Sequence, residues 1–156
     1  MPVGPPEAAG GIKGNGGMWG QKHKKLAVAL TCADWRLHQR KVDMNARVAK
    51  LLGVDGVDLI CVPGPDGMLR PERAGEWQTA VGQIKLLIGA HAPLAVVVLA
   101  HQHCAGHPVT DAEHDRDVVT TAKALKTATG FAGPVKAVIM VYRSDKAWDL
   151  KPVAAF

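Results

Sequence analysis

The stretch from Leu94 to Ala100 is an unbroken apolar run, and it restricts the fold more than any other part of the sequence. A strand of this kind has no polar face to turn toward water, so it needs cover on both sides. Such cover is typical of parallel sheets, in which crossover helices lie on both faces. The run ends at His101-Gln102-His103-Cys104. An α/β fold is therefore expected, with polar side chains at the end of a buried strand.

Segments typical of strands and helices alternate along the chain from Lys25 onward. A helix is expected at residues 38–52, and Gly53 follows it as a stop signal. A later helix is expected from Pro108 to Gly130, because Thr110 and Glu113 have capping-box spacing. The remaining elements are strands at residues 26–30, 57–62, 94–100, 135–142 and 147–153, and a helix at residues 72–89. The order βαβαβαββ predicts a mainly parallel sheet with helices on both faces and an antiparallel hairpin at one edge.

Residues 1–22 differ from the rest of the chain, because they are rich in Gly and Pro and show no hydrophobic periodicity. Such a segment buries too little surface to offset the entropy lost on ordering. We expect a flexible arm over residues 1–22 and a single domain over residues 23–156.

The composition excludes several classes of protein. Hydrophobic residues make up 47% of the chain and charged residues 21%, as in ordered globular proteins. No apolar stretch is long enough to span a membrane, and the first residues lack the apolar core of a secretory signal, so a cytoplasmic protein is expected. The formal charge is +5, but the basic residues are scattered and aromatic residues are few, which argues against nucleic-acid binding. A mild positive field suits a small anionic substrate or product.

Two short motifs hold the residues with metal-binding chemistry. Cys32-Ala33-Asp34-Trp35-Arg36 follows the first expected strand, and His101-Gln102-His103-Cys104 follows the third. If these strands are neighbours, both motifs meet at the carboxyl edge of the sheet. Two thiolates and an imidazole suit Zn²⁺, and three protein ligands leave a fourth position for water, as in catalytic zinc sites. The odd number of cysteines, three, also argues against a disulfide framework.

Asp34 has two possible roles beside such a site. Its carboxylate can take the fourth position on the metal and close the site. It can instead pair with Arg36, whose guanidinium holds a carboxylate ionised and oriented. The sequence leaves both roles open.

The pattern Cys-x-Asp-x-Arg followed by His-x-x-Cys resembles the β-class carbonic anhydrase family. The resemblance extends through the apolar strand before His101, the pair Glu76-Trp77 and the closing hairpin, and it covers residues 25–153. It implies a zinc enzyme in which Cys32, His101 and Cys104 bind the metal. It further implies reversible hydration of CO₂ to bicarbonate by a zinc-bound hydroxide, with Asp34 and Arg36 as catalytic residues, in a homodimer or larger assembly.

The sequence also departs from that family. Pro63-Gly64-Pro65-Asp66-Gly67 stands where the family usually has an Arg-Asn-Ala-Gly-Asn-like loop, and Ala105 rather than Gly follows Cys104. Three alternatives therefore stay open. The same site could hydrolyse carbon disulfide or carbonyl sulfide, the fold could be a non-catalytic zinc-binding scaffold, or Cys32 and Cys104 could form a redox dithiol.

Several other residues are assigned ordinary roles. Cys61 is expected to be a small buried residue in mid-strand, and the segment 63–67 a simple turn. The acidic residues from Asp111 to Asp117 are expected to complement the dipole of the helix that they begin. The histidines divide into His38, His103 and His107, which remain candidate ligands or proton shuttles, and His23, His91 and His114, which are expected to be exposed to solvent.

Overall fold

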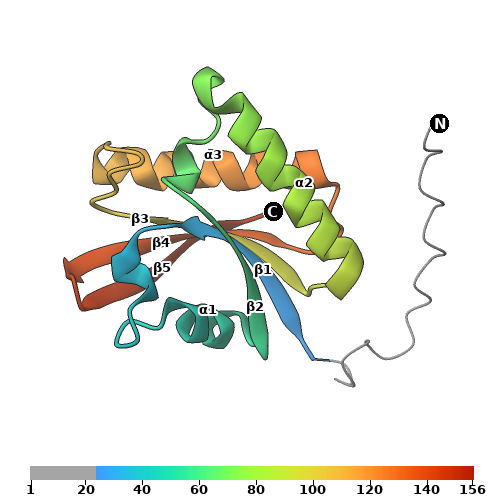
Figure 1. Ribbon diagram of the computed structural model, residues 1–156, viewed down its shortest axis with the longest axis horizontal. Helices are drawn as coiled ribbons and strands as arrows, with labels where there is room; N and C mark the ends of the chain where they lie inside the picture. The colour runs from blue at the N-terminus through green and yellow to red at the C-terminus, as the bar shows by residue number, and fades with distance from the viewer. Residues whose placement is uncertain (1–23) are drawn as a thin grey trace, which may run out of the picture.

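The computed structural model describes residues 24–156, and the arm predicted for residues 1–22 lies outside them. A five-stranded sheet with the strand order β2-β1-β3-β4-β5 forms the centre of this part of the chain (Figure 1). The strands are β1 (Leu26–Cys32), β2 (Gly56–Val62), β3 (Ala95–His101), β4 (Val135–Ser144) and β5 (Ala147–Ala155). The α-helices are α1 (Met44–Leu52), α2 (Ala74–His91) and α3 (Asp111–Thr129), and the 3-10 helices are η1 (Trp35–His38), η2 (Pro65–Gly67) and η3 (Pro71–Arg73).

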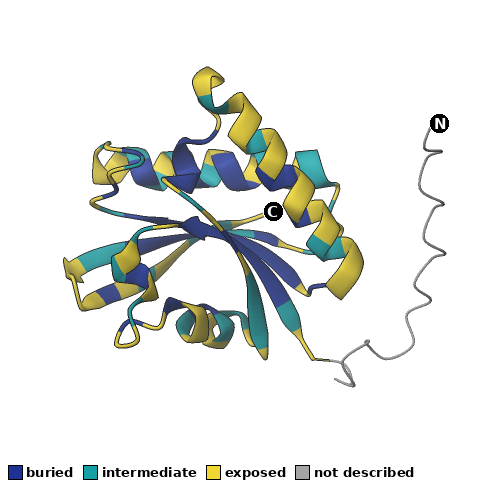
Figure 2. Cartoon of the chain, viewed as in Figure 1, coloured by how far each residue is buried: buried dark blue, intermediate teal, exposed yellow. Residues whose placement is uncertain are grey.

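The predicted α/β class is confirmed, because the first four strands are parallel and helices lie on both faces of the sheet. Helix α1 covers one face, and α2 and α3 cover the other (Figure 1). Every residue of β3 is buried, as the apolar run predicts (Figure 2). The chain leaves β1 toward α1 and leaves β3 toward α3, so the two connections diverge to opposite faces at adjacent strands.

The hairpin of β4 and β5 closes one edge of the sheet in an antiparallel pair, also as predicted. Pro152 lies within β5, opposite Val138, and a register shift separates Val138 from Ala137. Proline cannot donate to a strand ladder, so it is tolerated on an edge strand beside such an irregularity.

The structure corrects three local predictions. The helix expected at residues 38–52 begins only at Met44, because Asp43 adopts a left-handed conformation with φ 39° and caps the helix by accepting from the Ala46 N–H. The segment 63–67 is more than a turn, since it contains η2, whose three residues are all buried. Cys61 is exposed rather than buried, because β2 is an edge strand of the sheet.

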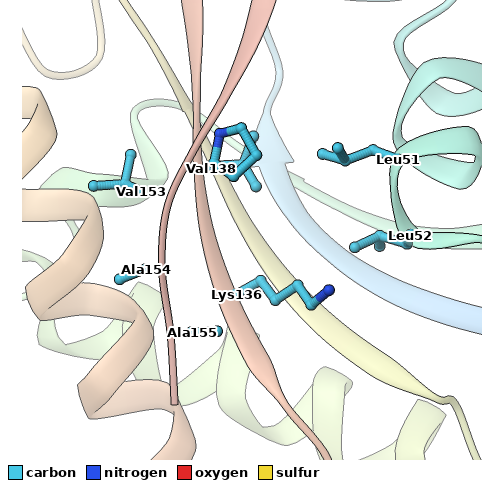
Figure 3. Close-up of a pocket in the computed structure, with 8 residues that line it drawn as sticks. Leu51, Leu52, Lys136, Val138, Val153, Ala154 and Ala155 are labelled. Atoms are coloured by element: carbon cyan, nitrogen blue, oxygen red, sulfur yellow. The ribbon is translucent and has the colours of Figure 1, made fainter.

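A groove of about 310 Å³ lies between α1 and the β4–β5 hairpin. Leu51 and Leu52 project from α1 toward the sheet beside Val138 and Lys136 (Figure 3). Among the described residues, this groove is lined by Lys136 and seven apolar residues. Among residues 24–156, no helix has the length and hydropathy needed to cross a membrane.

Candidate metal centre and a second polar cluster

The carboxyl ends of two adjacent strands bring the first candidate site together. Cys32 is the last residue of β1 and His101 is the last residue of β3, and these strands pair in parallel with Thr31 opposite Leu99. Cys104 lies in the loop that follows β3. One ligand atom from each of the three residues lies within 4.8 Å of the others, and all three residues are buried. The predicted convergence of the two motifs is therefore what the structure shows.

The two sulfur atoms have a separation that fits a single tetrahedral ion. Cys32 Sγ and Cys104 Sγ lie 3.8 Å apart. Two sulfurs bound to one tetrahedral Zn²⁺ at about 2.3 Å are separated by about 3.8 Å. The thiol pair is therefore already spaced as a pair of zinc ligands.

His101 is oriented as metal-binding histidines are. Its Nδ1 lies 2.7 Å from the carbonyl oxygen of Gln102, so this nitrogen carries the hydrogen and donates it. Its Nε2 is buried and has no hydrogen-bond partner in the described part of the chain. A backbone carbonyl that fixes the tautomer in this way is the usual support of a metal-binding imidazole. His101 therefore presents a free lone pair beside the two sulfurs.

The electrostatics of this group favour a cation. The pKa of Cys32 falls to about 4, chiefly because the Cys104 side chain hydrogen-bonds to it. The pKa of Cys104 is raised by that same contact. Burial lowers the pKa of His101, but the nearby Cys32 thiol group, the Gln102 carbonyl oxygen and the Asp34 carboxylate together outweigh this effect, and the net shift is upward. The lowered pKa of Cys32 favours its thiolate form, which is the form in which a cysteine binds a metal ion.

Asp34 and Arg36 form an ion pair beside this group. Arg36 Nη2 lies 2.7 Å from Asp34 Oδ2 and Arg36 Nε lies 3.0 Å from Asp34 Oδ1, which is a bidentate contact. Asp34 also accepts from the Arg36 N–H at 2.9 Å, which caps η1. The hydrogen bonds from the Arg36 side chain are the main reason why the pKa of Asp34 is lowered. Of the two arrangements considered from the sequence, the structure shows Asp34 paired with Arg36.

The position of Arg36 is fixed by contacts beyond Asp34. Its Nη2 also donates to the carbonyl oxygen of His103 at 2.9 Å. Its guanidinium carbon lies 5.4 Å from the ring centroid of Trp148 and 5.9 Å from that of Tyr142. Arg36 therefore joins the loop after β1 to the loop after β3 and to the closing hairpin. The carboxylate oxygen Asp34 Oδ2 remains 3.9 Å from His101 Nε2, close to the candidate metal position.

The remaining candidate histidines lie outside the Cys32, His101 and Cys104 group. His38 Nε2 lies 2.8 Å from the carbonyl oxygen of Cys32. The ring of His103 lies against Tyr142, with a centroid distance of 4.5 Å. His91 is exposed, as predicted, and pairs with Asp58, whereas His23 lies outside the described residues.

His107 belongs instead to a second polar cluster, which the sequence analysis missed. Asp66, His107 and His114 each place one possible ligand atom within 4.8 Å of the other two. The prediction that His114 is exposed is wrong, since it is fully buried. One signal was available in the sequence: His114 falls on the same helical stripe as Val118, Thr121 and Leu125, which face the sheet.

The fold and the first site together define a class of protein. It is an α/β protein whose parallel strands carry a Cys–His–Cys group, able to hold a metal ion, to the carboxyl edge of the sheet. The chain belongs to the family described as "Putative carbonic anhydrase", whose model matches residues 22–154.

A solved structure supports the fold. The chain is similar to the crystal structure of a carbonic anhydrase from Streptococcus mutans, with a TM-score of 0.52 and 17% sequence identity over 81% of each chain. At that identity the likeness shows the fold alone. The comparison with curated proteins gave no match.

Proposed function

We propose that this protein is a zinc-dependent carbonic anhydrase, a lyase that interconverts CO₂ and bicarbonate. The single observation that supports this most strongly is the convergence of Cys32 Sγ, Cys104 Sγ and His101 Nε2 beside the Asp34–Arg36 pair. A purely structural zinc site is usually closed by four Cys or His ligands, whereas this group supplies three. Membership of the carbonic anhydrase family supports the same activity.

Cys32, His101 and Cys104 would hold the ion. The backbone carbonyl oxygen of Gln102 would support the imidazole of His101 by accepting a hydrogen bond from its Nδ1. Zinc held in this way supplies Lewis acidity, which makes water nucleophilic near neutral pH. The remaining steps depend on side chains of this chain.

Asp34 would orient the attacking water by accepting a hydrogen bond from it. The ion pair with Arg36 keeps the Asp34 carboxylate ionised, so that it can accept a hydrogen bond. Two parallel contacts from the guanidinium also fix the orientation of the carboxylate oxygens. The same contacts keep Asp34 from occupying the position that the water needs. The attack of water oxygen on the carbon of CO₂ forms one C–O bond and releases one proton, giving bicarbonate.

Assembly and location are part of the same proposal. We expect a homodimer or larger homo-oligomer in the cytoplasm, with residues 23–156 as one zinc-binding domain and residues 1–22 as an arm. Multi-angle light scattering would test the assembly, and a fully active monomer would contradict it.

Metal analysis followed by stopped-flow CO₂ hydration tests the function. The expected result is zinc bound by thiolates and a hydration rate that disappears when zinc is removed and returns when it is added. Folded, zinc-loaded protein without CO₂ hydration would refute the proposal. Parallel assays with carbon disulfide and carbonyl sulfide would then show whether the same site acts on those substrates.

A further inference from the structure

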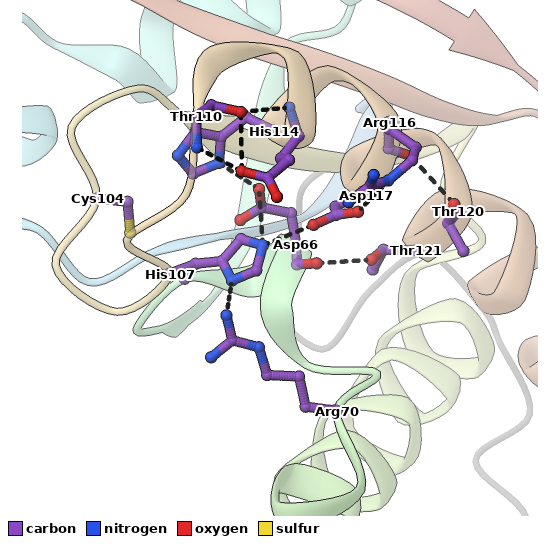
Figure 4. A network of polar contacts seen from close by, with 12 residues as sticks. Asp66, Arg70, Cys104, His107, Thr110, His114, Arg116, Asp117, Thr120 and Thr121 are labelled. Carbon is purple, nitrogen blue, oxygen red and sulfur yellow. Dashed lines mark hydrogen bonds and ion pairs between the residues drawn. The ribbon is translucent and has the colours of Figure 1, made fainter.

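The loop that departs from the family pattern contributes to a second cluster of metal-binding side chains. Asp66 of η2 lies 2.6 Å from His114 Nδ1 and 4.0 Å from His107 Nε2, both measured from Asp66 Oδ2. Asp117 Oδ2 lies 2.8 Å from His107 Nε2 (Figure 4). The side chains of Asp66 and His114 are 0% exposed and that of His107 is 4% exposed. Two imidazoles and one carboxylate therefore meet at one buried place, with the partly exposed carboxylate of Asp117 at its edge.

We propose that Asp66, His107 and His114, with Asp117 as a further oxygen donor, form a second metal site for a divalent transition-metal ion such as Zn²⁺. Imidazole nitrogen and carboxylate oxygen are both ordinary zinc ligands. This site is chemically distinct from the Cys32, His101 and Cys104 group, because it offers no sulfur. The inference does not depend on the proposed carbonic anhydrase activity.

Unpaired atoms within the cluster point to a missing ligand. Asp66 Oδ1 and His114 Nε2 are buried and have no hydrogen-bond partner in residues 24–156. Leaving such a group unsatisfied costs about 1–3 kcal/mol, and more when the group is charged. The contact of His114 Nδ1 with Asp66 Oδ2 places the hydrogen on Nδ1, which leaves the lone pair of Nε2 free. A bound cation would use the lone pairs of Asp66 Oδ1 and His114 Nε2, which the protein leaves unused, whereas His107 would have to give up one of its present hydrogen bonds to bind it.

The charges in the cluster favour a cation over an anion. Asp117 pairs with the mostly exposed guanidinium of Arg116, and Arg70 contacts His107, whereas the fully buried carboxylate of Asp66 contacts only histidines among residues 24–156. A cavity of about 190 Å³ is lined by Asp66, His107 and Asp117 together with Arg70 and two threonines, so an ion has a path to the cluster. Thr121 of α3 holds η2 in place, since its hydroxyl donates to the carbonyl oxygen of Asp66 at 3.3 Å.

Arg70 opposes metal binding at this site, which makes its role testable. Arg70 Nη2 donates to His107 Nδ1 at 2.8 Å, so the hydrogen of this imidazole resides on Nε2 and is donated to Asp117 (Figure 4). A metal-bound imidazole normally donates its other N–H to an acceptor. Arg70 is a donor and offers no acceptor, in contrast to the carbonyl oxygen that supports His101. The second site should therefore bind metal more weakly than the first and should improve when Arg70 is replaced by an acceptor.

Titration of the metal-free full-length protein with Co²⁺ separates the two sites spectroscopically. Cobalt bound by thiolates gives an intense sulfur-to-metal charge-transfer band, whereas cobalt bound only by nitrogen and oxygen gives weak d–d bands. We expect about one equivalent that develops the charge-transfer band and a second, weaker equivalent that adds only d–d absorption. Saturation at a single equivalent, with no further d–d absorption, would overturn the proposal.

Variants assign the second equivalent to the cluster. Asp117→Asn and His107→Gln should each lose it while keeping the charge-transfer band, and His91→Gln is the matched control, because His91 pairs with Asp58 away from the cluster. Arg70→Gln should tighten the second equivalent by about tenfold, the order of effect known for changes in the support of a metal ligand. Circular dichroism checks that each variant is folded. A second equivalent that survives in both folded cluster variants would refute the assignment, and unchanged affinity in Arg70→Gln would refute the opposing role of Arg70.

Discussion

Gly64 and Gly106 are in backbone contact, so closely that a Cβ atom on Gly64 would lie 2.6 Å from the carbonyl carbon of Gly106. Gly64 follows β2, and Gly106 lies two residues after Cys104. The Gly64 N–H also points at Cys32 Sγ, at a distance of 3.5 Å. These two contacts join the loop after β2 to the end of β1 and to the loop after β3, and the close approach of the two backbones explains why position 64 needs glycine.

Gly64→Ala should therefore destabilise the protein and disturb the metal centre. Gly64 has φ +49°, a conformation that side chains rarely adopt, and the added methyl group would collide with backbone atoms that cannot move aside. We expect the free energy of unfolding to fall by about 1–3 kcal/mol, measured by urea denaturation. Gly82→Ala is the control: it lies within α2 with nothing within 4 Å, and should raise stability by about 0.5–1 kcal/mol. Equal stability of Gly64→Ala and wild type would contradict this account.

The three candidate ligands should be individually essential for the first metal. Cys32→Ser, His101→Ala and Cys104→Ser are each expected to lose thiolate-bound zinc and CO₂ hydration, because each removes one of only three protein ligands. His103→Ala should keep the metal, since its ring lies against Tyr142. Inductively coupled plasma mass spectrometry of the purified variants measures the zinc content.

The matched control for the cysteine variants is Cys61→Ser, because Cys61 is an exposed cysteine outside the cluster. It should keep both zinc and activity. The choice of ligand histidine would be wrong if His103→Ala lost the metal while His101→Ala retained it.

The sequence predicted the order of the elements well because its signals are local. The apolar run before His101 marks the central strand, and Thr110 with Glu113 marks the start of α3, where the capping box is present. The start of α1 was wrong by six residues, since Met44 rather than residue 38 begins it. The apolar stripe sets the face of a helix, but the left-handed conformation of Asp43 decides where it begins.

The second polar cluster could not be predicted from motifs, because its members are scattered. Asp66, His107 and His114 meet only through the packing of η2 and the loop after β3 against α3. Cys32, His101 and Cys104 were easier to predict, since they fall at the ends of strands that a parallel sheet places side by side. The partners of the Asp34 and Arg36 side chains, by contrast, could not be predicted. They depend on side-chain geometry, which the spacing of residues in the sequence does not determine.

The capping box of α3 gives a dependence of stability on pH. Hydrogen bonds from the backbone N–H and the hydroxyl of Thr110 lower the pKa of Glu113 in the folded protein. A lowered folded pKa means that the stabilisation is present above the unfolded pKa of about 4.3 and is lost as pH falls through the folded pKa. Glu113→Gln mimics the protonated state. Urea denaturation should show wild type more stable than Glu113→Gln at pH 7, with a difference that narrows as the pH falls below about 4. A difference that does not change with pH would contradict this.

The Asp34–Arg36 pair should control access to the first metal. Arg36 is held by the His103 carbonyl and the Trp148 ring, and so restrains a carboxylate whose Oδ2 lies 3.9 Å from His101 Nε2. In Arg36→Ala the freed carboxylate is expected to bind the zinc and block the fourth position. Zinc content should therefore be retained, while CO₂ hydration should fall by about two orders of magnitude, as for loss of a positioned proton acceptor.

Two comparisons show whether Arg36 acts through Asp34. Asp34→Ala should keep zinc and also lose most activity, because no acceptor orients the water. Adding Arg36→Ala to Asp34→Ala should then cause little further loss, since two residues that act as a unit give strongly non-additive effects. Arg143→Ala is the matched control, because Arg143 pairs with Asp149 and not with Asp34. Full activity in Arg36→Ala, or losses that simply add in the double variant, would show that Arg36 does not restrain Asp34 and would leave a metal centre of three ligands alone.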